Sequence, residues 1–291
     1  MRTLLTAFAI LFLFTGCVKN VEMDLPDNES LLVVNSFFNP GDTWQVNVSK
    51  SRNMQQRMQN VDVENARVTL YEDGVLLDTM RYTSGGNYVL TTHKPVPGKT
   101  YTLKVSAPGF PDVESEQRLE SRILIESLTY DYINDPNGQG MQQPRLKIKF
   151  TDVPSQKNYY QIVVSSMLQG PFGEMSRECI FSEDPVVDAV LFDNCNGLLF
   201  DDNLFEGRSY ELAVPVGWGR DTTGGTGEEM LYQVELRTLT EAMFEYQRTY
   251  SLQKNSEGDP FAQPVQVYNN ITSGYGVFGG FRSDMDSIVV K

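Results

Sequence analysis

Short stretches in which apolar and polar residues alternate run through most of this chain. Residues 43–51 show the pattern clearly, because Trp44, Val46 and Val48 would share one face of an extended strand and polar residues the other. Dense turn sequences, such as NPGD at residues 39–42, separate these stretches. Strands of this kind bury their apolar face only by pairing into sheets, so the sequence predicts a mainly β fold.

The predicted strands fall into two groups, separated where the composition changes near residue 120. We therefore expect two antiparallel β-sandwich domains, an immunoglobulin-like one over residues 31–120 and a β-rich one over residues 121–291. In the first, the Asp73-Gly74 pair predicts a tight hairpin turn, and the Pro-Gly pair at residues 97–98 predicts a second hairpin.

One amphipathic helix is expected, near residues 238–254 of the second domain. Thr238 and Glu241 have the spacing of a capping box, which marks the start of a helix. This helix either packs its apolar stripe on the second sheet, which we favour, or offers the stripe to a partner as a groove. The residues that recur on one face at helical intervals are Leu239, Met243, Tyr246 and Tyr250.

The first seventeen residues have the layout of a lipoprotein export signal. Arg2 precedes an almost continuously apolar run over residues 4–14, and small residues lead into Cys17. The run is shorter than the roughly 20 residues that span a bilayer. We expect removal of residues 1–16, acylation of Cys17 and a flexible tether over residues 17–30. Two or more acyl chains give stable membrane attachment. An ordinary cleaved signal or a short uncleaved anchor are the alternatives.

The acidic composition excludes nucleic acid as a partner. The chain has 24 Lys and Arg against 38 Asp and Glu, a formal net charge of −14. Without Arg2 of the signal, the mature chain would stand at 23 minus 38, or −15. Affinity for nucleic acid comes mainly from Lys and Arg, so such a surface repels phosphate backbones.

The two cysteines that remain after Cys17 are Cys179 and Cys195. An exported protein meets an oxidising environment, so we favour a disulfide between them over two buried thiols. We expect no metal site, since the chain has one histidine and no CxxC pair, and no cofactor. The acidic stretch from Asp193 to Asn203 is either a calcium loop or, as we favour, a solvated loop.

A binding protein explains the sequence better than an enzyme does. The chain has no GxSxG elbow, P-loop or HExxH motif, and a Ser-His-Asp triad would have to use His93, its one histidine. The alternative is a secreted, lipid-anchored hydrolase of glycans or peptides that uses paired carboxylates, for which many acidic residues are present.

Four residues are candidates for contact with a partner or ligand. Met54 and Met58 lie in a Met- and Gln-rich stretch that forms either an adaptable contact site or a plain exposed loop. Tyr275 and Phe278 lie in a stretch rich in glycine and aromatic residues near the C-terminus. Its glycines permit positive φ or close backbone approach, so the aromatic rings either pack on the sheet or form an exposed contact loop.

The C-terminal stretch DPFAQPVQVYNNITSGYGVFGGF, residues 259–281, carries a family resemblance. With the preceding features it resembles the Bacteroidetes outer-membrane lipoproteins grouped as domain of unknown function 4249, and the similarity covers nearly the whole chain. The features that follow in the family's order are the signal with its lipid cysteine, LLVVNSFF at residues 31–38, the segment Ala66 to Asp73, and PGKTY at residues 97–101.

The resemblance implies β-sandwich domains and attachment to the outer membrane by lipid, on the cell surface or the periplasmic face. It also implies partnership with a TonB-dependent transporter in nutrient capture or uptake. Apart from the resemblance, Trp44, Trp218 and the many tyrosines either stack on a glycan or peptide ligand or, as is usual for single aromatic residues in sandwiches, belong to the core. The family supplies no catalytic residues.

Overall fold

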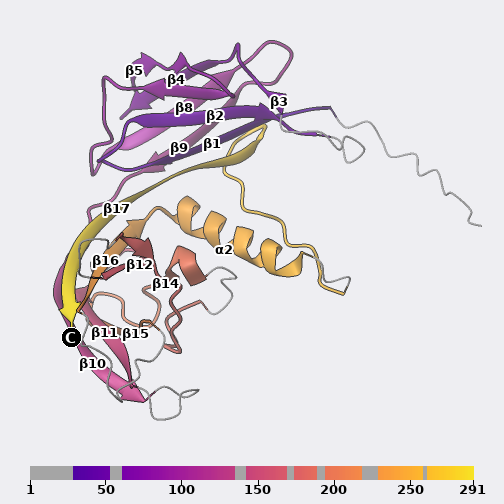
Figure 1. Ribbon diagram of the computed structural model, residues 1–291. Coiled ribbons are helices and arrows are strands. Elements are labelled where there is room, and N and C mark those ends of the chain that lie inside the picture. Colours follow the sequence, from indigo (N-terminus) through magenta and orange to yellow (C-terminus); the bar gives the residue numbers. More distant parts are fainter. Residues whose placement is uncertain are drawn as a thin grey trace, which may run out of the picture.

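The computed structural model describes residues 29–52, 61–134, 142–168, 174–188, 194–217, 229–257 and 261–291. Of the residues in these ranges, 52% lie in strands and 8% in helix, so the protein is mainly β, which confirms the fold class predicted from the alternating patterns. Figure 1 shows a first sandwich above a second group of sheets, joined by one long strand, β17 (Tyr275–Val290).

The first sandwich consists of two sheets that face each other across one core. Four strands form one sheet in the order β5-β4-β8-β9, and the strands of the other follow the order β17-β1-β2-β7-β6, with β3 paired to β2. The bounds are β1 Leu32–Phe38, β2 Trp44–Lys50, β3 Val61–Asp62, β4 Arg67–Glu72, β5 Val75–Thr79, β6 Arg81–Tyr82, β7 Asn87–Leu90, β8 Thr100–Ser106 and β9 Val113–Arg118.

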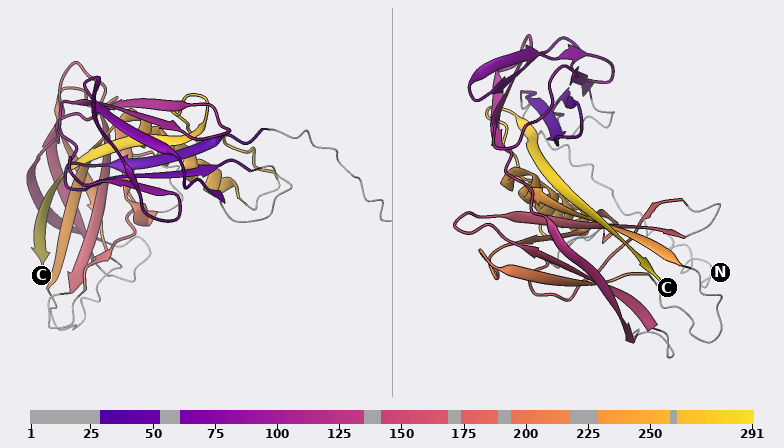
Figure 2. Two further views of the ribbon diagram at one scale, coloured as in Figure 1. Left: turned by 90° about the horizontal axis from the view of Figure 1, so that it is seen from above. Right: turned by 90° about the vertical axis from the view of Figure 1, so that its left-hand side faces the viewer.

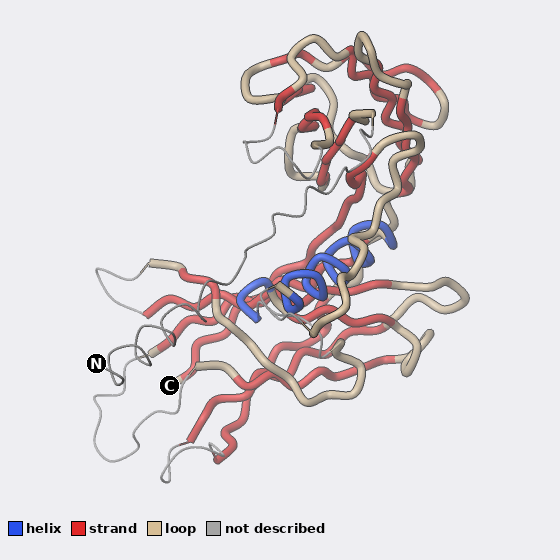
Figure 3. The backbone as a smooth tube through the Cα atoms, turned by 90° about the vertical axis from the view of Figure 1, so that its right-hand side faces the viewer, coloured by secondary structure: helices blue, strands red, loops and turns tan. Residues whose placement is uncertain are grey.

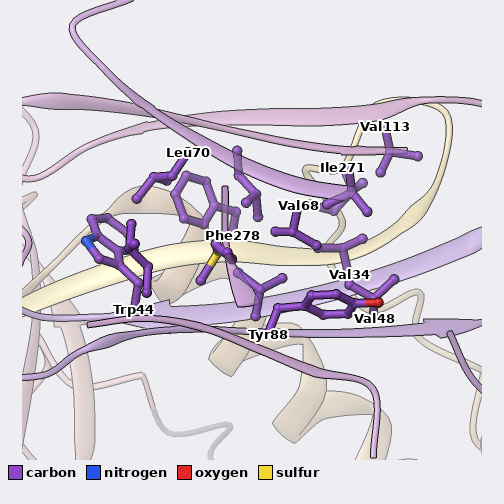
Figure 4. Close-up of a cluster of buried hydrophobic side chains, with 14 of the residues drawn as sticks. Val34, Trp44, Val48, Val68, Leu70, Tyr88, Val113, Ile271 and Phe278 are labelled. Carbon is purple, nitrogen blue, oxygen red and sulfur yellow. The ribbon is translucent and has the colours of Figure 1, made fainter. Parts of the chain in front are cut away.

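Aromatic rings fill the centre of this sandwich, as Figure 4 shows for part of it. The ring of Trp44 lies 4.7 Å from that of Tyr101 on the facing sheet, and Phe38 lies 4.9 Å from Phe278. All four side chains are fully buried. Alternation along each strand directs these residues inward, and such ring pairs add to the free energy gained by burial.

The second group of strands also forms two facing sheets, with the helix outside them. Its sheets have the orders β10-β11-β15 and β13-β12-β16-β17, with β14 paired to β12, around a core that includes Phe150, Tyr160 and Phe200. The bounds are β10 Ile125–Asn134, β11 Gln142–Thr151, β12 Tyr159–Leu168, β13 Ser176–Arg177, η2 Asn194–Asn196, β14 Leu198–Asp201, β15 Ser209–Pro215, β16 Met230–Leu239 and α2 Glu241–Ser256.

Strand β17 belongs to both groups, so that one ten-stranded sheet runs through the molecule (Figure 2, right). Its first six residues, 275–280, pair in parallel with β1, and the rest pairs antiparallel with β16. Ile271 and Phe278 lie in the core of the first sandwich. The expected segment 121–291 thus returns to complete the expected domain 31–120, and the pairing of β1 with β17 is a parallel one among antiparallel neighbours.

Gly276 makes this parallel pairing possible. Its φ is +115°, and a Cβ there would lie 2.0 Å from the carbonyl oxygen of Val34, its partner on β1. Asn270 adds two hydrogen bonds to the same strand, accepting from the Phe278 amide at 2.9 Å and donating to the Phe278 carbonyl at 2.8 Å. The glycines of this stretch therefore permit close approach, as one of the two sequence interpretations states.

The helix begins two residues later than the capping-box spacing suggests. The Thr240 side chain accepts a hydrogen bond from the Met243 amide at 3.3 Å and is the N-cap. Thr238 is still part of β16, and its hydroxyl accepts from the Ile123 amide instead. Because β16 pairs with β17 as far as Leu239, the backbone cannot turn into a helix before that residue.

The two predicted hairpins have different outcomes. Asp73 and Gly74 adopt positive φ values of 48° and 81° between β4 and β5, which confirms the first hairpin. The second prediction was wrong, because β7 pairs with β2 and β6 whereas β8 pairs with β4 and β9. The chain crosses from one sheet to the other near residues 97–98, a difference that a local turn signal does not reveal.

We predict that Gly276→Ala lowers the free energy of unfolding by about 3 kcal/mol, because the added methyl group would force β17 away from Val34. Gly98→Ala is the matched control: Gly98 has a φ of +77°, but no described atom lies within 4 Å of the added Cβ. It should cost about 1 kcal/mol. Urea unfolding measures both losses, and equal values would contradict a tight contact between β1 and β17.

Candidate functional site

A pocket of about 230 Å³ lies between α2 and the outer face of the sheet that contains β12 and β16. Figure 3 shows the helix running alongside these strands. Met243 and Phe244 hold the start of the helix against Leu199 and Leu239, whereas the later turns of the helix form one wall of the pocket. The site therefore lies outside both sandwich cores, where a side chain can meet solvent or a ligand.

Aromatic rings form this wall. Tyr246 and Tyr250 are one helical turn apart, and their rings are nearly parallel, at 16° and 5.8 Å between centroids. Phe37 of β1 lies 5.4 Å from Tyr246. Phe37 alternates with the inward Phe38 and so faces the helix, and Phe37 and Tyr250 are each 42% exposed. These half-open rings give a ligand a flat apolar surface.

Burial raises the pKa of Tyr246, with a smaller contribution from the neighbouring Tyr250. The hydroxyl group of Tyr246 therefore stays protonated throughout the neutral range and can donate a hydrogen bond. It makes none with another residue of the described part of the chain. A phenol that is held in place in this way offers a ligand both a ring face and a donor.

Polar side chains form the floor and are held in fixed orientations. The Arg237 guanidinium donates to Gln161 Oε1 at 3.2 Å and to Glu235 Oε2 at 2.7 Å, and it lies 4.6 Å from the ring centre of Phe281. Gln161 in turn donates to the Asn196 carbonyl at 2.7 Å. Such support holds a binding group ready for its ligand.

A disulfide joins Cys179 to Cys195, as the sequence predicts. Cys179 follows β13 and Cys195 lies in η2, so the bond ties together two short segments at the rim of the pocket. Arg177 and Asn196, from these two segments, both line the pocket. The disulfide therefore limits how far the rim can open.

A larger cavity, of about 500 Å³, lies on the outer face of the first sandwich. Arg67, Lys104, Asp112 and Glu114 are among its lining residues. Lys104 forms an ion pair with Glu114 at 3.1 Å, and its ammonium group lies 5.6 Å from the ring centre of Tyr71. The positive and negative charges of the residues that line this cavity are thus balanced, and its lining does not indicate a particular class of ligand.

The predicted contact residues do not meet at the pocket. Phe278 is fully buried in the first core, so its assignment as a partner contact was wrong, because alternation along β17 directs it inward. Tyr275 is 49% exposed at the start of β17 but does not line the pocket. Met54, Met58 and Cys17 lie outside the described residues.

The acidic stretch is held by a lysine. Asp201 and Asp202 both form ion pairs with Lys157, at 3.0 and 2.8 Å. Asp193 lies outside the described residues. Within the described ranges, no group of three or more His, Cys, Asp and Glu residues is arranged to hold a metal ion.

The sequence indicated part of this site. It predicted the apolar stripe of the helix that includes Tyr246 and Tyr250. In the structure the first residues of this stripe pack on the sheet, whereas Tyr246 and Tyr250 line the pocket. The sequence missed Phe37, Arg177 and Arg237, because they come from strands that only the sheet order brings together. An aromatic residue at the outward position of an alternating strand is the signal that could have indicated Phe37.

The structure defines a mainly β protein of two sandwiches on a shared sheet, with a polar and aromatic pocket outside the cores. The chain belongs to the family described as Domain of unknown function (DUF4249), which matches residues 18–287. None of the curated proteins matches it. Among the helices of the described ranges, none has the length and apolar character to cross a membrane.

We predict that replacing both Cys179 and Cys195 by serine lowers the free energy of unfolding by about 3 kcal/mol, since the bond closes a short loop. The midpoint of urea unfolding measures the loss. Wild-type protein unfolded with reductant is the matched control and should give the midpoint of the double variant. Unchanged midpoints in both would show that the bond does not stabilise the rim.

Proposed function

We propose that this protein is a lipid-anchored outer-membrane binding protein that captures a glycan or a peptide in the pocket beneath α2. The observation that supports the proposal best is the pocket itself, in which half-open aromatic rings stand beside fixed guanidinium and amide groups. Small-molecule sites combine apolar surface with a few oriented polar groups in this way.

The anchor that we propose is the lipid on Cys17. The tether of residues 17–30 would then separate β1 from the membrane by up to ~45 Å, at ~3.3 Å per residue. Strand β1, which follows the tether, contributes Phe37 to the pocket, and the other lining residues come from the second group of strands and α2.

We further propose that the protein works with a TonB-dependent transporter in nutrient uptake, as the resemblance to Bacteroidetes lipoproteins implies. A hydrolase with paired carboxylates would need two acids beside its substrate. The residues described as lining the pocket beneath α2 include neither Asp nor Glu, so this pocket favours binding.

We predict that Tyr246→Ala weakens ligand binding about tenfold, because it removes both a stacking surface and a donor. Affinity electrophoresis in gels with soluble polysaccharides, and calorimetry with a casein peptide digest, would identify a ligand and measure the loss. Tyr275→Ala, which removes a tyrosine ring outside the pocket, is the control and should bind normally. Equal binding by both variants would remove the pocket from the proposal.

We predict that Cys17→Ala abolishes incorporation of labelled palmitate and moves the protein from the membrane to the soluble fraction, because the acyl chains are the proposed anchor. Cys179→Ser is the control and should keep the label. The tethered protein should co-purify with a transporter from native outer membranes. Palmitate retained by Cys17→Ala would contradict the anchor, and recovery of the wild type without a transporter would contradict the partnership.

A further inference from the structure

The pocket beneath α2 differs in charge from the rest of the chain. The mature sequence stands at 23 minus 38, or −15, so acids outnumber cations over the protein as a whole. Among the described residues that line the pocket, two are arginines, Arg177 and Arg237, and none is acidic. The cavity on the first sandwich shows no such bias, because Asp112 and Glu114 lie there with Arg67 and Lys104.

The two arginines are engaged to different degrees. Arg237 donates to Glu235 and Gln161, so part of its charge is balanced within the sheet. Arg177, on β13 at the rim, is exposed and forms no ion pair or side-chain hydrogen bond with another described residue. A guanidinium group whose N–H donors are not used by neighbouring side chains is suited to a carboxylate, which it binds through two parallel hydrogen bonds.

We propose that the pocket binds a carboxylate-bearing saccharide, an oligomer of uronic acid residues, with a sugar ring against Tyr246 and Tyr250 and its carboxylate on Arg177. The inference rests on the proposed function and names the chemical class of its ligand. The cavity of about 230 Å³ is smaller than the ~300–1,000 Å³ of sites that enclose a whole drug-sized ligand. It would therefore hold one residue of the oligomer and leave the rest outside.

The surroundings favour a saccharide over an acidic peptide. The rings of Tyr246 and Tyr250 are stacked on each other, and the outer face of such a pair suits the C–H face of a sugar ring. An extended peptide binds best by adding a strand to an open sheet edge. The floor strands β12 and β16 are paired on both sides. The outermost strand at the rim, β13, has two residues, which is too short an edge for an added strand.

Calorimetry on the full-length mature protein in detergent tests the inference. The probes are an oligomer of galacturonic acid, the neutral galactose oligomer of equal length, and an oligoglutamate peptide. We expect the uronate to bind about tenfold more tightly than the neutral oligomer and to lose this advantage at high salt, because its carboxylate pairs with an exposed cation.

Substitutions at Arg177 assign the carboxylate contact. Arg177→Gln should weaken uronate binding about tenfold, to about the affinity of the neutral oligomer. Arg177→Lys, which keeps the charge but not the two-pronged geometry, should give an intermediate loss. Arg118→Gln is the matched control, since it removes an exposed arginine of the first sandwich and should change nothing. Arg177 is exposed, and circular dichroism would check that its variants stay folded.

The outcomes separate this inference from the proposed function. Equal binding of the uronate and the neutral oligomer would overturn the inference and leave the proposed function standing. Binding of oligoglutamate that depends on Arg177, without binding of the uronate, would overturn the saccharide assignment. A protein that binds neither these probes nor the polysaccharides and casein peptides named above would overturn both.

Discussion

The pairing of β17 with β1 on one side and with β16 on the other is the interaction on which the rest of the structure depends. It requires Gly276, because the carbonyl of Val34 occupies the space of a side chain there. It also positions the helix, since the Thr240 hydroxyl accepts from the Gly280 amide and the Thr240 amide donates to the Gly280 carbonyl. Without this strand, Phe37 from the first sandwich and Tyr246 from α2 would not come together.

The pocket beneath α2 shows how a site can arise outside the cores of a sandwich protein. Its floor is the outer face of the shared sheet, which the helix covers only in part. The disulfide between Cys179 and Cys195 links the two short segments that form the rim of the pocket. Two arginines and no acid are among the described residues that line it, and one of the two, Arg237, is paired with Glu235. The charge that this place offers a ligand therefore depends mainly on Arg177.

Alternation and turn sequences predicted many of the strands, because they depend on residues that are neighbours in the chain, but they did not indicate β9 or the glycine-rich β17. Trp44 and Tyr101 are buried where the period of two places them. The same pattern left open which strands pair with each other. At residues 97–98, where a hairpin was expected, the chain instead crosses from one sheet to the other. The pattern also left open whether Phe278 packs on the sheet or lies in an exposed loop, since its burial depends on contact with Phe38, far away in the sequence.

The sequence by itself determined the class of fold, one amphipathic helix and the two cysteines able to form a bridge, because periodicity, capping residues and residue type are local properties. Only the tertiary structure decided that the C-terminal strand completes the first sandwich, that Thr240 caps the helix, and that two arginines and three aromatic rings share a pocket. The physical reason is the long-range pairing of strands. The free energy of that pairing comes from contacts between residues as distant as Asn35 and Val277, which no local pattern encodes.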